Sequence, residues 1–203
     1  MNSALVIMKF GGTSVGDAAC ISRAAQICAK AARESAVVVV VSAMSGVTNR
    51  LIEAATLSEA GEGQRALELL EEIRLQHSSA LAELIPEESA RKRLTARMDE
   101  LLNDAKRLCE GTALLRELTP RSLDLISSLG ERLSAPLLAS AISALGIRSE
   151  PVEATELIVT DGFHGGAEPL MDLTRARCEA RLRPMLQLGV IPVVTGFIGS
   201  SQD

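Results

Sequence analysis

A lysine, two glycines and two hydroxyl residues stand together near the start of the sequence, as Lys9, Gly11, Gly12, Thr13 and Ser14. Glycines let a ligand approach the main chain closely, and exposed N–H groups in a turn that leads into a helix favour an anion. A lysine ammonium beside them adds a point charge that suits phosphate. The group therefore predicts a phosphate site. A lysine at the end of a strand often only reaches solvent, however, and the local pattern leaves both interpretations open.

A second group of small and hydroxyl residues, at 42–48, follows five consecutive valines at 37–41. A valine run of this kind is typical of a strand that is buried on both faces of a parallel sheet. Open α/β sheets bind ligands at the carboxyl ends of such strands, which is where this group lies. Ser45 could instead cap a helix that begins at Val47, and both roles are compatible because caps and ligand donors occupy the same position.

Glu131 follows Gly130 inside a helical pattern that is otherwise mainly apolar. A glycine in a helix interior costs roughly 1 kcal/mol relative to alanine, which suggests that something approaches the helix backbone closely at this point. Glu131 could then present its carboxylate to a ligand. The alternative is a surface glutamate that pairs with Arg132 or another cation.

The histidines and cysteines give little support for a metal site. His77 falls on an apolar stripe and is predicted to pack at the edge of the core, whereas His164 lies in a turn-rich loop and is predicted to be exposed. Cys20 and Cys28 are predicted to share a helix about 12 Å apart, which is too far for a disulfide. We expect the cysteines to be small core residues or surface thiols in a reducing compartment.

The elements that would position these residues alternate between strands and helices. An apolar run at 5–8, a helical stripe at 18–34 and the valine run predict a right-handed βαβ unit. Two long amphipathic patterns, at 66–84 and 94–109, predict an antiparallel helical hairpin. The later signals are weak strands at 147–152 and 156–159, a helix at 173–188, and a strand from Val190 that runs into a glycine-flanked loop.

The composition limits the core and the partners. With 47% hydrophobic residues, no Trp or Tyr and only 3 Phe, the core must be aliphatic. A net charge of −5 without a strongly basic stretch argues against nucleic acid as a partner. The apolar run before Lys9 is too short for a signal peptide or a membrane span. We therefore expect a soluble cytoplasmic protein with no membrane partner.

Four motifs, at 9–14, 42–48, 128–131 and 196–199, occur in the order and approximate spacing of aspartate kinases, which the whole chain resembles. These enzymes belong to the amino-acid kinase family. The resemblance implies an α/β fold, namely a truncated three-layer αβα sandwich of the amino-acid kinase (carbamate kinase-like) type with a mostly parallel central sheet. It also implies transfer of the γ-phosphoryl group of ATP to the side-chain carboxylate of L-aspartate, the first step in the biosynthesis of lysine, threonine and methionine.

The resemblance assigns four residues to the phosphate side. Lys9 would be the catalytic residue, because it would hold the ATP phosphates and stabilise charge as the phosphoryl group moves. Gly11 and Gly12 would supply main-chain N–H groups, and Ser42 would line the phosphate side. None of these residues is a metal ligand, since Mg²⁺ would be held mainly by the nucleotide and by a half of the kinase domain that is missing from this sequence.

The resemblance assigns four further residues to the amino acid. Thr48 would contact the substrate, and Glu131 would pair with its α-ammonium group. Gly196 and Phe197 would shape the substrate pocket through main-chain contacts. No general base is required, because the attacking carboxylate of aspartate is already ionised at neutral pH.

The sequence departs from the family pattern at its end. In the family, a glycine-rich motif with arginine and aspartate follows the loop at 196–199, and the nucleotide half and the regulatory domains come later. We interpret 1–203 as the N-terminal lobe, with a helical hairpin insert at about 64–118, and expect it to be inactive alone and to form homo-oligomers. The alternatives are a non-catalytic lobe that self-associates, or an enzyme of the same fold that acts on glutamate, acetylglutamate or a nucleotide monophosphate. Glu131 argues against the second alternative, because an acidic group suits a free α-ammonium.

Overall fold

Residues 4–201 are described by the computed structural model, and the strands within them form one parallel sheet. The strand order is β1 (Ala4–Phe10), β2 (Ser35–Val41), β4 (Ile191–Thr195) and β3 (Ser149–Val152). Each strand is parallel to its neighbours. The valines at 37–41 thus belong to an interior strand, which confirms the prediction from the run of β-branched residues.

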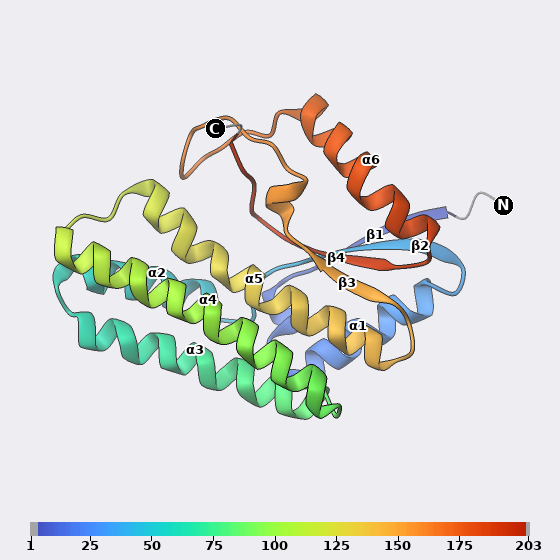
Figure 1. Ribbon diagram of the computed structural model, residues 1–203, viewed down its shortest axis with the longest axis horizontal. Helices are drawn as coiled ribbons and strands as arrows, with labels where there is room; N and C mark the ends of the chain where they lie inside the picture. Colours follow the sequence, from blue (N-terminus) through green and yellow to red (C-terminus); the bar gives the residue numbers. More distant parts are fainter. Residues whose placement is uncertain (1–3, 202–203) are drawn as a thin grey trace.

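Helices lie on both faces of the sheet and give three layers (Figure 1). The α-helices in the described residues are α1 (Ala18–Ala31), α2 (Val47–Ala60), α3 (Gly63–Leu84), α4 (Glu88–Leu115), α5 (Pro120–Ala144) and α6 (Met171–Gln187). α6 covers one face, while α1 and α5 contact the strands from the other face and α2 to α4 lie beyond them. None of the helices within residues 4–201 is both long enough and apolar enough to cross a membrane.

The two faces of the sheet carry separate aliphatic cores. The larger core lies between the sheet and α1 to α5, and it takes Val37, Val39 and Val41 from β2. The smaller core lies under α6 and includes Val38 together with Met185 of α6. Successive side chains of a strand point to opposite faces, so an interior strand between two helical layers needs apolar residues at every position.

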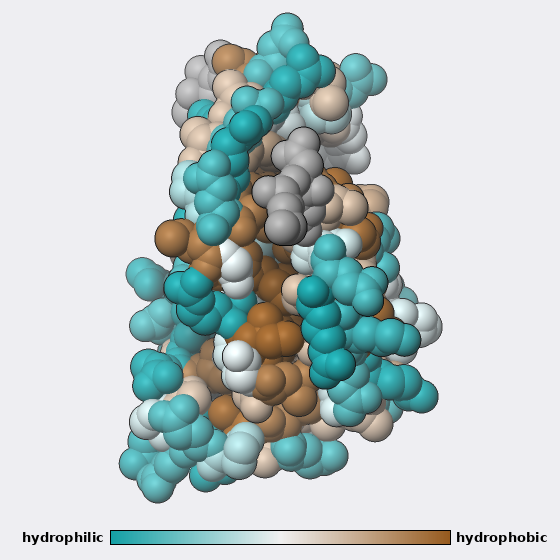
Figure 2. Space-filling view, turned by 90° about the vertical axis from the view of Figure 1, so that its right-hand side faces the viewer, coloured by the Kyte–Doolittle hydropathy of each residue, from teal (hydrophilic) through white to brown (hydrophobic). Residues whose placement is uncertain are grey.

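Within residues 4–201, β1 is covered on one face only. Met8 and Phe10 pack into the larger core, whereas Leu5 and Ile7 on the opposite face are 56% and 66% exposed. The residues of the smaller core that the structure describes come from other parts of the chain than β1. On the side of the molecule where the described chain begins, an apolar strip runs between hydrophilic flanks (Figure 2).

The predicted helical hairpin is present as α3 and α4, which pack against each other. Both helices also contact α2 and α5. Ile73 of α3 and Leu101 of α4 are members of the larger core. The hairpin therefore extends that core beyond the sheet.

One strand prediction is wrong. The segment at 156–159 is not a strand: Ala154–Glu156 forms a 3₁₀ turn, η2, and Val159 makes only an isolated bridge to Ser200. The Ala154 N–H donates to Thr195 Oγ1 at 2.8 Å, which ties this segment to the end of β4. Tertiary contacts of this kind override a weak local strand preference.

Candidate functional site

The predicted site residues gather at one edge of the sheet, because β1, β2 and β4 are adjacent and parallel. The hydrogen-bond ladder continues past the strand ends: the Ser42 N–H donates to the Phe10 carbonyl at 3.0 Å, and the Gly196 N–H donates to the Val41 carbonyl at 2.8 Å. Lys9, Ser42 and Gly196 thus lie at the carboxyl ends of three neighbouring strands. This is the edge at which open α/β sheets bind ligands.

The two glycines after β1 serve different purposes. They lead into a short 3₁₀ turn, η1 (Gly12–Val15), and α1 begins after Asp17, whose side chain caps it by accepting from the Cys20 N–H at 2.7 Å. A Cβ on Gly12 would lie 3.1 Å from the Ala43 carbonyl oxygen, so this glycine allows the turn to pack on the loop after β2. A Cβ on Gly11 would meet nothing within 4 Å, which leaves space beside its main chain for a ligand.

Lys9 carries an exposed side chain next to this turn. Strand alternation places it on the same face of β1 as Ile7, away from the larger core. None of the ion pairs within residues 4–201 involves Lys9. Its ammonium is therefore available to an anion, and the phosphate role stays a prediction.

Glu131 on α5 is a buried carboxyl group, with 7% of the residue exposed. Its Oε1 accepts a hydrogen bond from the Ala43 N–H at 3.2 Å, which joins α5 to the loop after β2. Burial raises the pKa of Glu131, and the hydrogen bond from Ala43 opposes part of that rise. Because a buried charge is unfavourable unless it is paired, a carboxyl group in this position is a candidate for ligand recognition.

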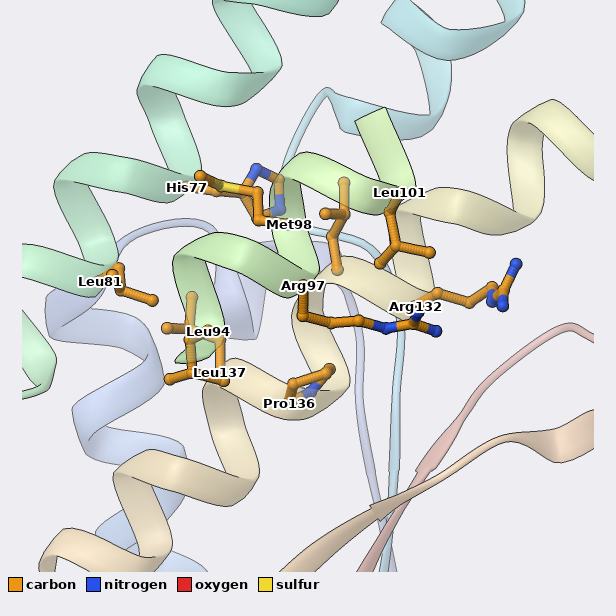
Figure 3. Close-up of a pocket in the computed structure, with 10 residues that line it drawn as sticks. His77, Leu81, Leu94, Arg97, Met98, Leu101, Arg132, Pro136 and Leu137 are labelled. Atoms are coloured by element: carbon orange, nitrogen blue, oxygen red, sulfur yellow. The ribbon is translucent and has the colours of Figure 1, made fainter. Parts of the chain in front are cut away.

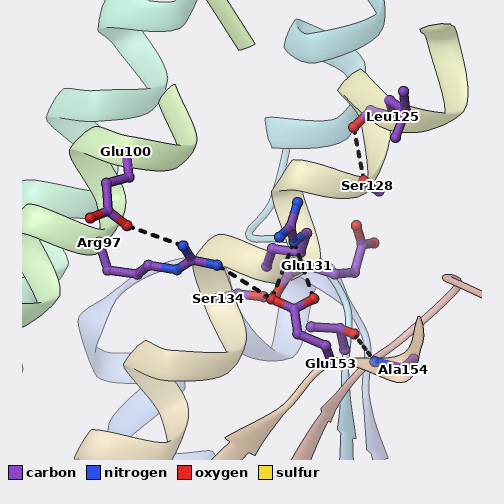
Figure 4. Close-up of polar contacts among 10 residues, drawn as sticks. Arg97, Glu100, Leu125, Ser128, Glu131, Ser134, Glu153 and Ala154 are labelled. Atoms are coloured by element: carbon purple, nitrogen blue, oxygen red, sulfur yellow. Dashed lines mark hydrogen bonds and ion pairs between the residues drawn. The ribbon is translucent and has the colours of Figure 1, made fainter. Parts of the chain in front are cut away.

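The alternative interpretation of Glu131 as a surface residue paired with Arg132 is wrong. Arg132 Nε instead donates to both carboxylate oxygens of Glu153, at 3.2 and 3.1 Å, and Arg97 lies 3.7 Å from the same carboxylate (Figure 4). Consecutive residues of a helix point about 100° apart. Glu131 consequently faces the loop after β2, while Arg132 faces the segment between β3 and η2.

Gly130 allows that loop to lie directly on α5. A Cβ on Gly130 would stand 2.6 Å from the Ala43 Cβ, so the close approach predicted from the sequence is confirmed, and the group that approaches is Ala43. One turn further along the helix, Ser134 Oγ donates to the Ser42 carbonyl at 2.7 Å. α5 therefore holds the loop at two successive residues, Ser42 and Ala43.

Thr48 lies half-buried in the first turn of α2. The residue that caps this helix is Gly46, with a φ of 79° and no side-chain hydrogen bond at the cap. Ser45 is therefore not the cap, contrary to the alternative weighed for it. A positive φ is readily adopted by glycine, and it turns the chain from the loop into α2.

Phe197 follows the buried Gly196 and combines a φ of 60° with a fully exposed side chain. A bulky residue with a positive φ is uncommon and strained, and strain of this kind is concentrated at functional sites. A Cβ on Gly196 would lie 2.9 Å from the Val41 carbonyl oxygen, so the glycine lets the end of β4 pack tightly on β2. The exposed ring therefore stands on a loop whose base is held firmly at the carboxyl edge of the sheet.

His77 is a core residue, as predicted. It is 3% exposed and lines a cavity of about 20 Å³ between α3, α4 and α5, which none of the residues assigned to the site lines (Figure 3). Nδ1 lies 2.8 Å from the Ile73 carbonyl oxygen, while Nε2 has no hydrogen-bond partner. Burial lowers the pKa of His77 and keeps the ring neutral.

The remaining titratable candidates do not form a metal centre. Within residues 4–201, no group of three or more His, Cys, Asp or Glu side chains is placed to hold a metal ion. His164 is exposed, as predicted, and its Nδ1 lies 3.4 Å from Asp124 Oδ2. Cys28 is free and buried, and burial raises the pKa of its thiol to about 12.

Two residues that contact the site loops were not assigned a role from the sequence. Ser134 could have been found, because it lies three residues after Glu131 and therefore on the same side of the helix. Gln76 of α3 contacts the main chain at Gly16 and Ser45, which are 60 and 31 residues away along the sequence. No local pattern points to such a contact.

Comparison with known proteins finds similarity to one family and to the aspartokinases within it. The model of the amino acid kinase family matches residues 4–203. Aspartokinase 1 (chloroplastic) of Arabidopsis thaliana is 31% identical over 198 residues, which cover 95% of this chain and 33% of that protein. Lysine-sensitive aspartokinase 3 of Escherichia coli is 30% identical over 204 residues, which cover 98% of this chain and 41% of that protein. The chain thus spans well under half the length of these relatives.

Solved structures agree with the sequence comparison. The crystal structure of E. coli aspartokinase III in complex with lysine and aspartate superposes with a TM-score of 0.86 at 28% identity, over 98% of this chain and 42% of that one. The structure of the same enzyme in complex with aspartate and ADP also gives a TM-score of 0.86, at 29% identity. The sheet and helices of this chain therefore correspond to part of that larger molecule.

Proposed function

Because this chain belongs to the amino acid kinase family, we propose that it forms the amino-acid-binding part of an aspartate kinase. Such an enzyme transfers the γ-phosphoryl group of ATP to the side-chain carboxylate of L-aspartate. The aspartokinase relatives support this assignment, as does the solved structure that is described with aspartate and ADP. The observation that carries the proposal is the buried carboxyl of Glu131, held by the Ala43 N–H at the carboxyl edge of the sheet.

Glu131 is proposed to bind the α-ammonium group of aspartate. Its position favours a cationic ligand, because a cation would offset the unfavourable burial of the carboxylate. A substrate without a free ammonium, such as acetylglutamate, would leave this charge unpaired. Thr48, in the first turn of α2, is proposed to form the rest of the amino-acid pocket together with Gly196 and Phe197 on the loop after β4.

Lys9, Gly11, Gly12 and Ser42 are proposed to bind the phosphates. In the reaction, a side-chain carboxylate oxygen of aspartate forms a bond to the γ-phosphorus, and the bond from that phosphorus to the bridging oxygen breaks, so that ADP leaves. No proton moves, because the carboxylate is ionised at neutral pH. Lys9 would stabilise the charge that develops on the transferring group, which is the main form of catalysis in phosphoryl transfer.

Mg²⁺ would be held mainly by the nucleotide, as the resemblance implies. When bound, Mg²⁺ neutralises charge on the β- and γ-phosphates. The chain contributes its cation and main-chain donors to the phosphates. The cytoplasmic location predicted from the sequence is part of the same proposal.

The amino-acid assignment can be tested on this chain by nuclear magnetic resonance. We expect L-aspartate to shift the Ala43 amide signal, because that N–H bonds to Glu131. N-acetyl-L-aspartate, which has the same carboxylates without the ammonium, should have a much smaller effect at equal concentration. Equal shifts with both compounds would contradict the role of Glu131.

A further inference from the structure

Gln76 connects α3 to both loops of the candidate site. Its Nε2 donates to the Gly16 carbonyl at 3.3 Å and to the Ser45 carbonyl at 3.2 Å. Gly16 ends the turn that follows β1, and Ser45 lies in the loop that follows β2. A side-chain amide has two N–H hydrogens, so one group can serve both carbonyls.

The orientation of this amide is determined by its other end. Arg50 of α2 donates from Nη1 to Gln76 Oε1 at 2.9 Å, and Arg50 Nε lies 3.2 Å from Glu72 Oε2 on α3. A guanidinium can only donate, so the oxygen of Gln76 must face Arg50 and its NH₂ group must face the two carbonyls. Glu72 and Arg50 thus hold Gln76 in the rotamer that reaches the loops.

The two loops that Gln76 joins are already in close contact. A Cβ on Gly16 would lie 3.2 Å from the Ser45 Cβ, and a Cβ on Gly12 would lie 3.1 Å from the Ala43 carbonyl oxygen. Close contact between small residues brings the loops together without a directional bond between them. The hydrogen bonds of Gln76 add direction, because they fix where each carbonyl points.

We propose that Gln76 is a positioning residue that holds the turn after β1 and the loop after β2 in register, so that Gly11, Gly12 and Ser42 face one phosphate group. The inference rests on the proposed function, because it takes these two loops to be the phosphate side of the site. Gln76 acts through the loops and does not touch the ligand. Arg50 and Glu72 support it from the layer of helices behind the site.

The test compares Gln76→Glu with wild type and with Gln26→Glu, a control at an exposed position of α1. Gln76→Glu keeps the acceptor for Arg50 and turns both donors into an acceptor that opposes the two carbonyls. The amides of Ser14 and Val47, which donate to Gly11 at 2.8 Å and to Met44 at 3.0 Å, report on the two loops. We expect their hydrogen exchange to be about tenfold faster or more in Gln76→Glu, and to be unchanged in Gln26→Glu.

Titration with inorganic phosphate, followed by the Gly11 and Gly12 amide signals, supplies the second measurement. The affinity should fall by about tenfold or more in Gln76→Glu and stay at the wild-type value in Gln26→Glu. If Gln76→Glu does not fold, as judged by circular dichroism, Gln76→Met carries the test, since it has similar length and removes both donors without adding charge.

Unchanged exchange in a folded variant would overturn the proposal, and so would faster exchange with unchanged phosphate affinity. Either result would leave the proposed function standing. If phosphate does not change the Gly11 and Gly12 amide signals of the wild-type chain, the phosphate site itself is contradicted. The positioning role of Gln76 is then contradicted as well.

Discussion

Glu131 has a buried carboxyl group, and its titration predicts how the stability of the protein depends on pH. Its pKa in the folded state is raised above the ordinary value of 4.5, so the folded state holds the proton more tightly than the unfolded state. The stabilisation is therefore fully present below about pH 4 and is lost as the pH rises through the raised pKa. At pH 7 we expect Glu131→Gln, which can still accept from the Ala43 N–H, to unfold at a higher temperature than wild type.

Thermal unfolding at a series of pH values checks this prediction. The advantage of Glu131→Gln should shrink as the pH is lowered, because the wild-type carboxyl then becomes neutral as well. Glu53→Gln, at an exposed position of α2, is the control and should show no such trend. A variant that is less stable than wild type at pH 7 would show that the charge of Glu131 is compensated within the fold.

Substitution of Lys9 should have a small effect on stability and a large effect on catalysis. Its side chain is exposed and joins none of the ion pairs within residues 4–201, so Lys9→Ala should change the unfolding temperature little. In a longer protein that contains this chain and the rest of the kinase, Lys9→Ala should lower kcat by about 100-fold or more. Lys30→Ala, at the exposed end of α1, is the control and should leave kcat unchanged. A fall in kcat of less than about fivefold would assign Lys9 a structural role.

At the scale of elements, the contact between α5 and the loop after β2 depends on Gly130. Alanine is favoured over glycine by about 1 kcal/mol in a helix interior, and overpacking typically costs about 1–3 kcal/mol. A Cβ at Gly130 would stand 2.6 Å from the Ala43 Cβ, so we expect Gly130→Ala to lower the free energy of unfolding, by up to about 2 kcal/mol once the gain in helix propensity is subtracted. Chemical denaturation measures this change.

Two further variants test whether contact with Ala43 is the reason that Gly130→Ala lowers stability. Gly111→Ala in α4, where a Cβ would meet nothing within 4 Å, should stabilise the protein by about 0.4–1 kcal/mol. Ala43→Gly combined with Gly130→Ala should recover part of the lost stability, because it removes the atom that clashes. If the double variant is no better than Gly130→Ala alone, the contact with Ala43 is not the cause.

At the scale of the whole molecule, the uncovered face of β1 predicts self-association. Leu5 and Ile7 are exposed on that face, and within residues 4–201 β1 pairs with another strand on one side only. Exposed apolar patches and free strand edges both promote association. We expect sedimentation of the chain to show a dimer or larger species, and Ile7→Lys to shift it toward monomer. Leu114→Lys, at an exposed leucine of α4, should leave the distribution unchanged.

Residues 1–203 should also lack kinase activity by themselves, because they span 33–41% of the relatives' length. MgATP should bind more weakly than about millimolar, corresponding to a free energy less favourable than about −4 kcal/mol. Calorimetric titration with MgATP and an assay of aspartate-dependent ADP release check this expectation. Micromolar binding, or turnover, would show that this chain needs no further part of the kinase.

The sequence by itself determined the long helices, the interior strand and the edge at which the site residues gather. Five valines in a row define an interior strand, and two amphipathic patterns define the hairpin. The site residues at the ends of β1, β2 and β4 must meet at one edge because the strands are parallel. These signals are local, since each depends on the periodicity or composition of a short segment.

Only the tertiary structure decided which partners these residues have. Arg132 pairs with Glu153, whereas Glu131 accepts from the Ala43 N–H. Gly46 caps α2, and the segment at 156–159 is not a strand. The tertiary structure also brought Gln76 to both site loops. The physical reason is that these outcomes depend on contacts between segments distant in the sequence, where packing and hydrogen bonding outweigh local preference.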